Sequence, residues 1–169
     1  MLRVRHIALG AVFTLATNLA MAFEPMTATI RVSNGALYDY VVIGENPAAT
    51  DGYDNAFDII APGNLSASMG EPFISAVVEH PDWKPAFRDL RGDVRSLSQR
   101  QEWQMVITSS LPKGVPLSIS LQSDRSSVPG KVKVLLSEGE KKIDLRERYL
   151  TPAPGPGAKA TLLLTVDQP

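Results

Sequence analysis

Apolar and polar residues alternate along most of the chain, with the two-residue period of a half-buried β-strand rather than the 3.6-residue period of a helix. In the segment Leu117–Leu121 the apolar residues fall on one face and the serines on the other. Trp103, Met105 and Ile107 form a similar apolar row. The pattern predicts about eight short strands: Thr27–Val32, Leu37–Ile43, Phe73–Glu79, Trp103–Ile107, Leu117–Leu121, Lys131–Leu136, Lys142–Leu145 and Thr161–Val166.

Turn-forming sequences separate these segments, as expected for antiparallel strands joined by short connections. Asn34-Gly35 follows the first predicted strand. Asn-Gly is a strong β-hairpin signal because both residues tolerate a positive φ. Three prolines crowd into Thr151–Gly157, which predicts a loop before the last strand.

Two segments depart from the alternation. Asn46–Gly70 is long and rich in Gly, Asn, Asp and Ala, a composition typical of a loop. Pro85–Gln101 is compatible with a short helix, although Gly92 in its middle is unfavourable there. The chain shows no internal repeat long enough to define two domains. We therefore predict an all-β fold, a single antiparallel β-sandwich with one long Asp-rich loop and room for one short helix.

The N-terminal segment Met1–Ala22 has the order of a secretory signal peptide. Arg3 and Arg5 make it positive, an apolar stretch follows, and Ala20-Met21-Ala22 is a small-residue cleavage pattern. The apolar stretch is too short for a membrane-spanning helix. The prediction is therefore cleavage after Ala22, leaving a β-sandwich domain at 23–169 without a membrane span.

Composition and charge narrow the class of protein. The chain has no cysteine, which excludes disulfides, thiolate metal sites and a cysteine nucleophile. Secretion without disulfides favours a bacterial protein of the periplasm or the cell exterior. The formal net charge of −1 becomes −3 when the two arginines of the leader are removed. A chain of this charge is not expected to bind nucleic acid.

The most prominent polar feature is an aspartate-rich loop. Asp51, Asp54 and Asp58 fall within eight residues. Oxygen-rich loops can hold calcium, although this spacing is not that of an EF-hand. The alternative is structural: the aspartates cap turns, and Asp54 or Asp58 forms a lock with Arg91 through a two-pronged carboxylate–guanidinium contact. Calcium is the only cofactor that the sequence suggests.

Two further residues could carry chemistry. His80 is the only histidine left after cleavage, and it sits near prolines without a G-x-S-x-G nucleophile motif, so no catalytic set is predicted. Trp83 lies in a loop-like segment and could present an aromatic face to a sugar ring or another ligand. Trp103 belongs to the apolar row and is expected in the core.

The order of motifs resembles an immunoglobulin-like β-sandwich module of bacterial exported and surface proteins. Such modules carry a T-D-G-[FY]-D loop followed by a D-[IL]-R segment. The residues that carry the resemblance are Tyr40–Gly44, Ala49–Asp54, Asp58, Ala61-Pro62, Phe87–Arg91, Trp103–Ile107 and Ile143–Arg146. The resemblance implies an immunoglobulin-like fold and a non-catalytic accessory or assembly role. It also marks Asp51, Asp54, Asp58 and Arg91 as structural landmarks.

Three functions therefore stand as hypotheses. The first is a non-catalytic exported protein that binds another exported or surface protein, with an exposed sheet edge able to accept a partner strand. The second is a carbohydrate-binding module that recognises polysaccharide, with or without calcium. The third is a small hydrolase that uses His80 or a pair of carboxylates.

Overall fold

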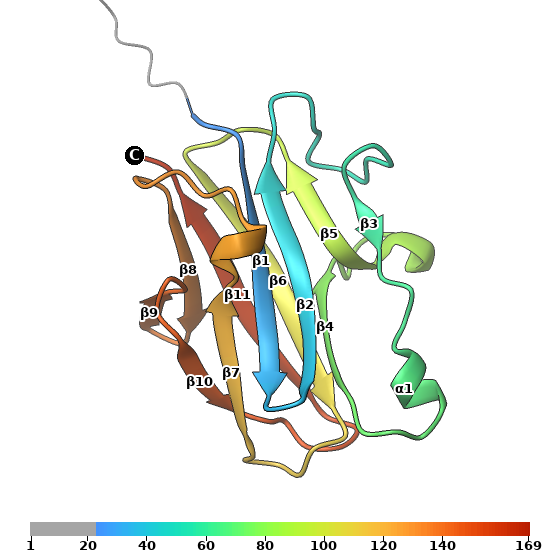
Figure 1. Cartoon of the computed structure of the whole chain (residues 1–169). Coiled ribbons are helices and arrows are strands. Elements are labelled where there is room, and N and C mark those ends of the chain that lie inside the picture. The colour runs from blue at the N-terminus through green and yellow to red at the C-terminus, as the bar shows by residue number, and fades with distance from the viewer. Residues whose placement is uncertain (1–22) are drawn as a thin grey trace, which may run out of the picture.

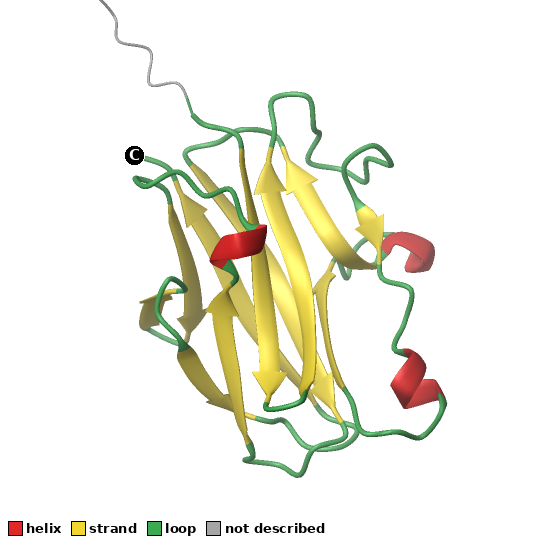
Figure 2. Cartoon of the chain, in the orientation of Figure 1, coloured by secondary structure: helices red, strands yellow, loops and turns green. Residues whose placement is uncertain are grey.

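The computed structural model describes residues 23–169, and the predicted signal peptide Met1–Ala22 lies outside them. The described chain is built from strands, with three short helical turns at its periphery (Figure 2). No helix within these residues is long and apolar enough to cross a membrane. The strands are β1 (Met26–Asn34), β2 (Leu37–Glu45), β3 (Ile59–Ile60), β4 (Ile74–Glu79), β5 (Asp89–Arg95), β6 (Arg100–Ser109), β7 (Pro116–Leu121), β8 (Lys133–Glu138), β9 (Lys141–Asp144), β10 (Tyr149–Pro152) and β11 (Lys159–Asp167). The helical turns are α1 (Leu65–Ser68), η1 (Pro85–Phe87) and η2 (Ser123–Arg125).

The strands form one continuous path that folds over into two layers. The order is β10-β7-β1-β2-β5-β4-β6-β11-β8-β9, with β3 attached to the outer side of β5. Figure 1 shows β7, β1 and β2 in the front layer and β6 and β11 behind them. Neighbouring strands are antiparallel except β2 and β5, which run parallel. The path therefore turns from one layer to the other at β5, and its two ends, β10 and β9, approach each other on the opposite side (Figure 1).

The core lies between the two layers and is made by the inward-facing residues of each strand. Trp103, Met105 and Ile107 are fully buried, as the alternation predicts. Leu117 and Ile119 of β7 are buried in the same cluster. Alternate burial along strands such as β4, β7 and β8 thus accounts for the sandwich, because each apolar face is removed from water by the other layer.

The predicted all-β sandwich is confirmed, and all eight expected strands are present. The sheet has 11 strands rather than about eight. The three additional ones are β3 in the long loop, β10 at the start of the proline-rich segment, and β5. The hairpin predicted at Asn34-Gly35 is also present: β1 and β2 pair in antiparallel register, and Gly35 adopts a φ of 56°.

The segment 85–101 departs most from expectation. Only η1 is helical, and the residues after it form β5. Gly92 has a specific role in this strand, because a Cβ there would lie 3.3 Å from the side chain of Ile59 on β3. The glycine that disfavours a helix is therefore the residue that lets β3 lie against β5.

Candidate functional site

Arg91 lies where the two layers divide. The second half of β5 pairs with β2, from Gly92 to Arg95, whereas its first two residues pair with β4. The Arg91 side chain fills the fork between β2 and β4: its Nη1 donates to Oδ1 of Asp39 at 2.6 Å, to the backbone oxygen of Tyr40, and to the backbone oxygen of Ala76 at 3.3 Å. Asp39 also accepts a hydrogen bond from the N–H of Ala76 at 2.9 Å. One ion pair therefore joins both layers.

The predicted partner of Arg91 was wrong. Neither Asp54 nor Asp58 contacts the guanidinium, whose carboxylate partner is Asp39. The physical reason is the strand geometry: Arg91 points into the fork between the layers, while the aspartate loop lies beyond the other half of β5. Arg91 does form a structural ion pair, but this pair joins the two layers of the sheet and does not hold the aspartate loop.

The aspartates of the loop accept hydrogen bonds from backbone amides. Asp58 accepts one from the N–H of Asp54 at 2.7 Å and one from the N–H of Val94 at 3.0 Å, which fastens the loop to β5. Asp54 itself caps the turn through the N–H of Ala56 at 3.0 Å. Burial raises the pKa of Asp58 above its ordinary value; these two amides partly offset the shift, while the negative charges of Asp93 and Asp54 add to it.

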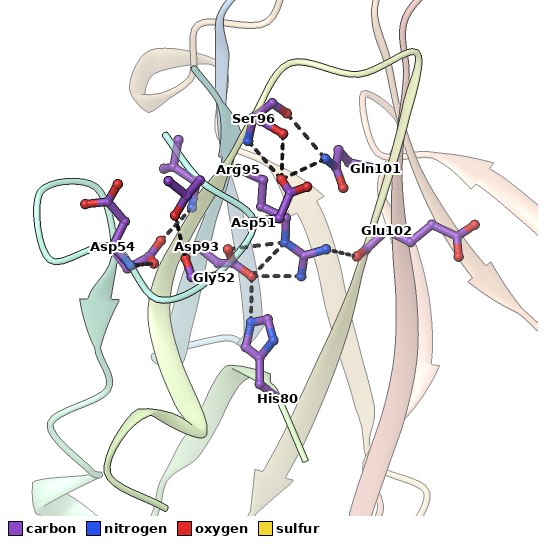
Figure 3. A network of polar contacts seen from close by, with 12 residues as sticks. Asp51, Gly52, Asp54, His80, Asp93, Arg95, Ser96, Gln101 and Glu102 are labelled. Carbon is purple, nitrogen blue, oxygen red and sulfur yellow. Dashed lines mark hydrogen bonds and ion pairs between the residues drawn. The ribbon is translucent and has the colours of Figure 1, made fainter. Parts of the chain in front are cut away.

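Asp51 binds a different part of the chain. Its Oδ1 accepts hydrogen bonds from the N–H and the Oγ of Ser96, at 3.1 and 2.6 Å, and from Gln101 at 3.4 Å (Figure 3). Within residues 23–169 no group of three or more His, Asp or Glu side chains is arranged to hold a metal ion. Calcium binding by Asp51, Asp54 and Asp58 stays a prediction, and the geometry assigns these carboxylates to loop attachment.

Asp93 is the centre of a buried polar network that sequence analysis did not identify. Its Oδ2 lies 2.8 Å from Nε2 of His80 and 3.0 Å from Nη2 of Arg95 (Figure 3). Arg95 continues the network by donating to the backbone oxygen of Glu102 at 2.7 Å. Burial alone would raise the pKa of Asp93, but the hydrogen bond with His80 and the charge of Arg95 outweigh it, so its pKa lies below the ordinary value.

Trp83 packs against the protein instead of presenting a free aromatic face. Its ring stacks on His80 with centroids 3.7 Å apart and an interplanar angle of 14°. It is also half-buried against the core. One ring face is therefore occupied, and the ligand-binding role predicted for Trp83 has no support in this arrangement.

A second buried carboxylate connects the two ends of the described chain. Glu45, at the end of β2, accepts hydrogen bonds from the side-chain amide of Gln168 at 2.7 Å and from the N–H of Ser98 at 3.0 Å. Gln168 in turn binds both backbone groups of Glu24. Burial raises the pKa of Glu45; the hydrogen bonds from Gln168 and Ser98 offset part of the rise, and the negative charge of Asp51 adds to it.

Exposed apolar side chains collect on the segment outside β5. Ile59, Ile60, Leu65 and Met69 are all exposed, and α1 has no buried residue. Leu65 and Met69 reach 74% and 66% exposure. From Ile59 to Gly70 the sequence contains no charged residue. This surface, residues 59–70, is called the β3–α1 surface below.

The side where the path of strands ends is closed over only part of its length. Leu145 closes one part: its N–H donates to Val134 of β8, and its backbone oxygen accepts from Leu121 of β7, both at 2.9 Å. The other part is a groove of about 750 Å³ between β10 and β11. Lys113, Glu138, Pro152, Lys159, Thr161 and Leu163 are among its lining residues.

Comparisons with protein-family models, with curated proteins and with solved structures each find no match. The resemblance to immunoglobulin-like modules therefore stays a prediction. The candidate sites are therefore identified by their geometry alone. No sequence motif marks Asp39, Asp93 or the groove, because the residues that form them come together only in the fold.

Proposed function

We propose that this chain is an exported, non-catalytic β-sandwich protein that binds another exported or surface protein in the bacterial periplasm or at the cell surface. The observation that carries the proposal is the distribution of exposed large apolar side chains. Four of them lie on the β3–α1 surface, and Leu150 and Leu163 lie on β10 and β11, beside the groove. Apolar surface collected in this way is typical of contact sites for other proteins.

The β3–α1 surface has the chemistry of a protein contact. Leu65 begins a four-residue helix that contributes nothing to the core, and Met69 is the C-cap residue that follows this helix. Methionine adapts its shape to irregular apolar partners. Because the segment carries no charge, a partner can cover it without desolvating an ion.

The ionisable groups near β5 support a non-catalytic role. Asp93 binds His80 and Arg95, and Asp51 and Asp58 bind backbone amides of neighbouring segments. Each of these contacts fastens a strand or a loop. His80 is further held by stacking on Trp83.

The test is site-specific photo-crosslinking in the cells that produce the protein. A benzophenone side chain at position 65 should form a covalent adduct with one defined protein, identified by mass spectrometry. The matched control places the same group at Asp124, an exposed residue of η2. Absence of an adduct at position 65, or the same adducts at both positions, would contradict the proposal.

Export is tested separately on the same protein. N-terminal sequencing of the exported chain should begin at Phe23. A chain recovered from the cytoplasm with Met1 intact would contradict export while leaving the crosslinking result to be judged by itself.

A further inference from the structure

β8 is shorter than the strand beside it. β6 pairs with β11 along its whole length, from Lys159 to Asp167, whereas β8 pairs only with the part from Leu163 onward. The chain reverses after Glu138, where Gly139 adopts a φ of 61°, and returns as β9 on the other side of β8. In the described part of the chain, the first four residues of β11 therefore have a strand on one side only.

The backbone groups of this part of β11 point toward the groove. Beyond the end of β11, the N–H of Gln168 donates to the backbone oxygen of Gln99, on the β6 side. Backbone groups of successive residues alternate between the two edges of a strand. Leu163 therefore faces β8, and Thr161 and Lys159 direct their N–H and C=O groups to the same edge, where β8 has already ended.

The opposite wall of the groove is the outer edge of β10. The N–H of Ala153 donates to Val115, beside β7, so by the same alternation Leu150 and Pro152 face away from β7. Pro152 has no N–H to offer. An extended segment entering the groove would therefore take its backbone hydrogen bonds mainly from β11.

Size and charge restrict what the groove can hold. Four residues of β11 span about 13 Å, which fits four or five residues of an extended segment. Within residues 23–169 Lys113 forms no ion pair, whereas Lys159 binds Glu79 at 3.0 Å. Glu138 accepts a hydrogen bond from the hydroxyl of Tyr149. The hydroxyl of Tyr149 does not neutralise the Glu138 carboxylate, so the positive charge that favours an acidic residue in the occupant is local to Lys113.

We propose that an extended segment of the partner protein adds to the sheet here, antiparallel to β11, in the position that β8 would take if it continued past Glu138. Small or apolar side chains of this segment face the groove, and an acidic residue lies beside Lys113. The proposal rests on the proposed function, protein binding, and names the form in which the partner is recognised: strand addition to an open sheet edge.

Two substitutions at Thr161 distinguish the contribution of its backbone N–H from that of its side chain. Thr161→Pro removes the N–H that faces the groove, while the hydrogen bonds to β6 come from its neighbours. Thr161→Val keeps the N–H and is the matched control. Circular dichroism and thermal unfolding verify that both variants fold. Lys113→Glu is an independent variant at the rim, outside any strand.

The probe is a displayed library of random linear 12-residue peptides, selected on the purified protein. Retained peptides should combine alternating small or apolar residues with an acidic residue. Their affinity should be within twofold for Thr161→Val, at least tenfold weaker for Thr161→Pro, and several-fold weaker for Lys113→Glu. Failure to retain any peptide, or equal binding to Thr161→Pro, would overturn the proposal.

Two further results would reassign the groove and overturn the proposal. Displacement of the peptides by a neutral glucan or a polyuronate would make it a polysaccharide site. A dimer of the chain that is lost in Thr161→Pro would make the occupant a second copy. A benzophenone at Leu163, an exposed residue that lines the groove, keeps the two proposals apart. If its adduct with the partner persists in a Thr161→Pro background with unchanged yield, strand addition fails while protein binding at position 65 stands; if no adduct forms at position 65, protein binding itself fails.

Discussion

The two places where the layers of the sandwich meet are built in opposite ways. At β5 the chain crosses from one layer to the other, and the fork is filled by Arg91, whose guanidinium binds Asp39 and two backbone oxygens. On the far side the ends of the path approach each other. There the backbone of Leu145 links β7 and β8, Tyr149 of β10 donates to Glu138 at the end of β8, and a groove separates β10 from the beginning of β11.

The difference shows how one sheet can be stable at one junction and still offer an unpaired strand edge for binding at the other. At the first junction both edges of β5 are paired, with β2 and β4 on one side and with β3 on the other. Where β2 and β4 separate, the side chains of Arg91 and Asp39 bind their backbone groups. At the second, β8 stops four residues short of the beginning of β11, so part of an edge stays uncovered. Unpaired edges invite another strand, and natural proteins keep them short, as here.

Proline substitutions at neighbouring positions of β11 should produce the largest contrast. Ala160→Pro removes an N–H that faces β6 and should cost about 3 kcal/mol of unfolding free energy, because the hydrogen bond is lost and its carbonyl partner on β6 is left without a donor. Thr161→Pro removes one that faces the groove and should cost less than about 1 kcal/mol. Urea unfolding monitored by circular dichroism measures both. Equal losses would show that β11 has no open edge.

Removing the charge of Arg91, at the junction formed by β5, should have the next-largest effect on the unfolding free energy. Arg91→Leu leaves Asp39 partly buried without its cation and two carbonyl groups without a donor. We expect a loss of about 2–3 kcal/mol of unfolding free energy. Arg100→Leu, which removes exposed pairs with Glu102 and Asp167, is the control and should change stability by less than about 1 kcal/mol. A loss at Arg91 no larger than the control would refute its role in joining the layers.

The Asp93 network predicts a smaller, pH-dependent effect. Because the pKa of Asp93 is below its ordinary value of 3.8, its ionised form stabilises the fold above that pH, and this contribution disappears as the pH falls through the lowered pKa. Asp93→Asn should therefore cost about 2 kcal/mol at neutral pH, and the difference from the natural chain should shrink below pH 3.8. Unfolding curves from pH 7 to pH 2 test this. A difference that is constant across this range would contradict it.

The smallest effect on stability is expected at the β3–α1 surface. Leu65→Ser with Met69→Ser should change the unfolding free energy by no more than about 0.5 kcal/mol, since both side chains are exposed. The same double variant should lose the protein partner captured by crosslinking nearby. A large loss of stability would mean that these side chains pack against the fold.

The alternation of apolar and polar residues predicted the sandwich well, because burial of one strand face requires an apolar residue at every second position. The inward row of Trp103, Met105 and Ile107 needs no knowledge of its neighbours to be identified. β5 was missed for a physical reason: its polar residues serve the fork and the Asp93 network, so they interrupt the alternation. Arg91 could be singled out, but its partner Asp39 lies 52 residues away in sequence and only the fold brings them together.

The groove could not be predicted, since it arises from strands that end at different places. β8 ends at Glu138 because Gly139 turns, and nothing in the composition of β11 records that its neighbour is short. The aspartate loop illustrates the same limit. Its residues are those that bind calcium elsewhere, and only the positions of Val94 and Ser96 reveal that they accept backbone hydrogen bonds.

Amide hydrogen exchange along β11 tests the central claim most directly. In the free protein, the N–H of Thr161 should exchange much faster than that of Leu163, which β8 covers, and faster than that of Leu162, which faces β6. On addition of the partner, exchange at Thr161 should slow to the rate of its neighbours. If Thr161 is already as protected as Leu163 in the free protein, the edge is closed and the account is wrong.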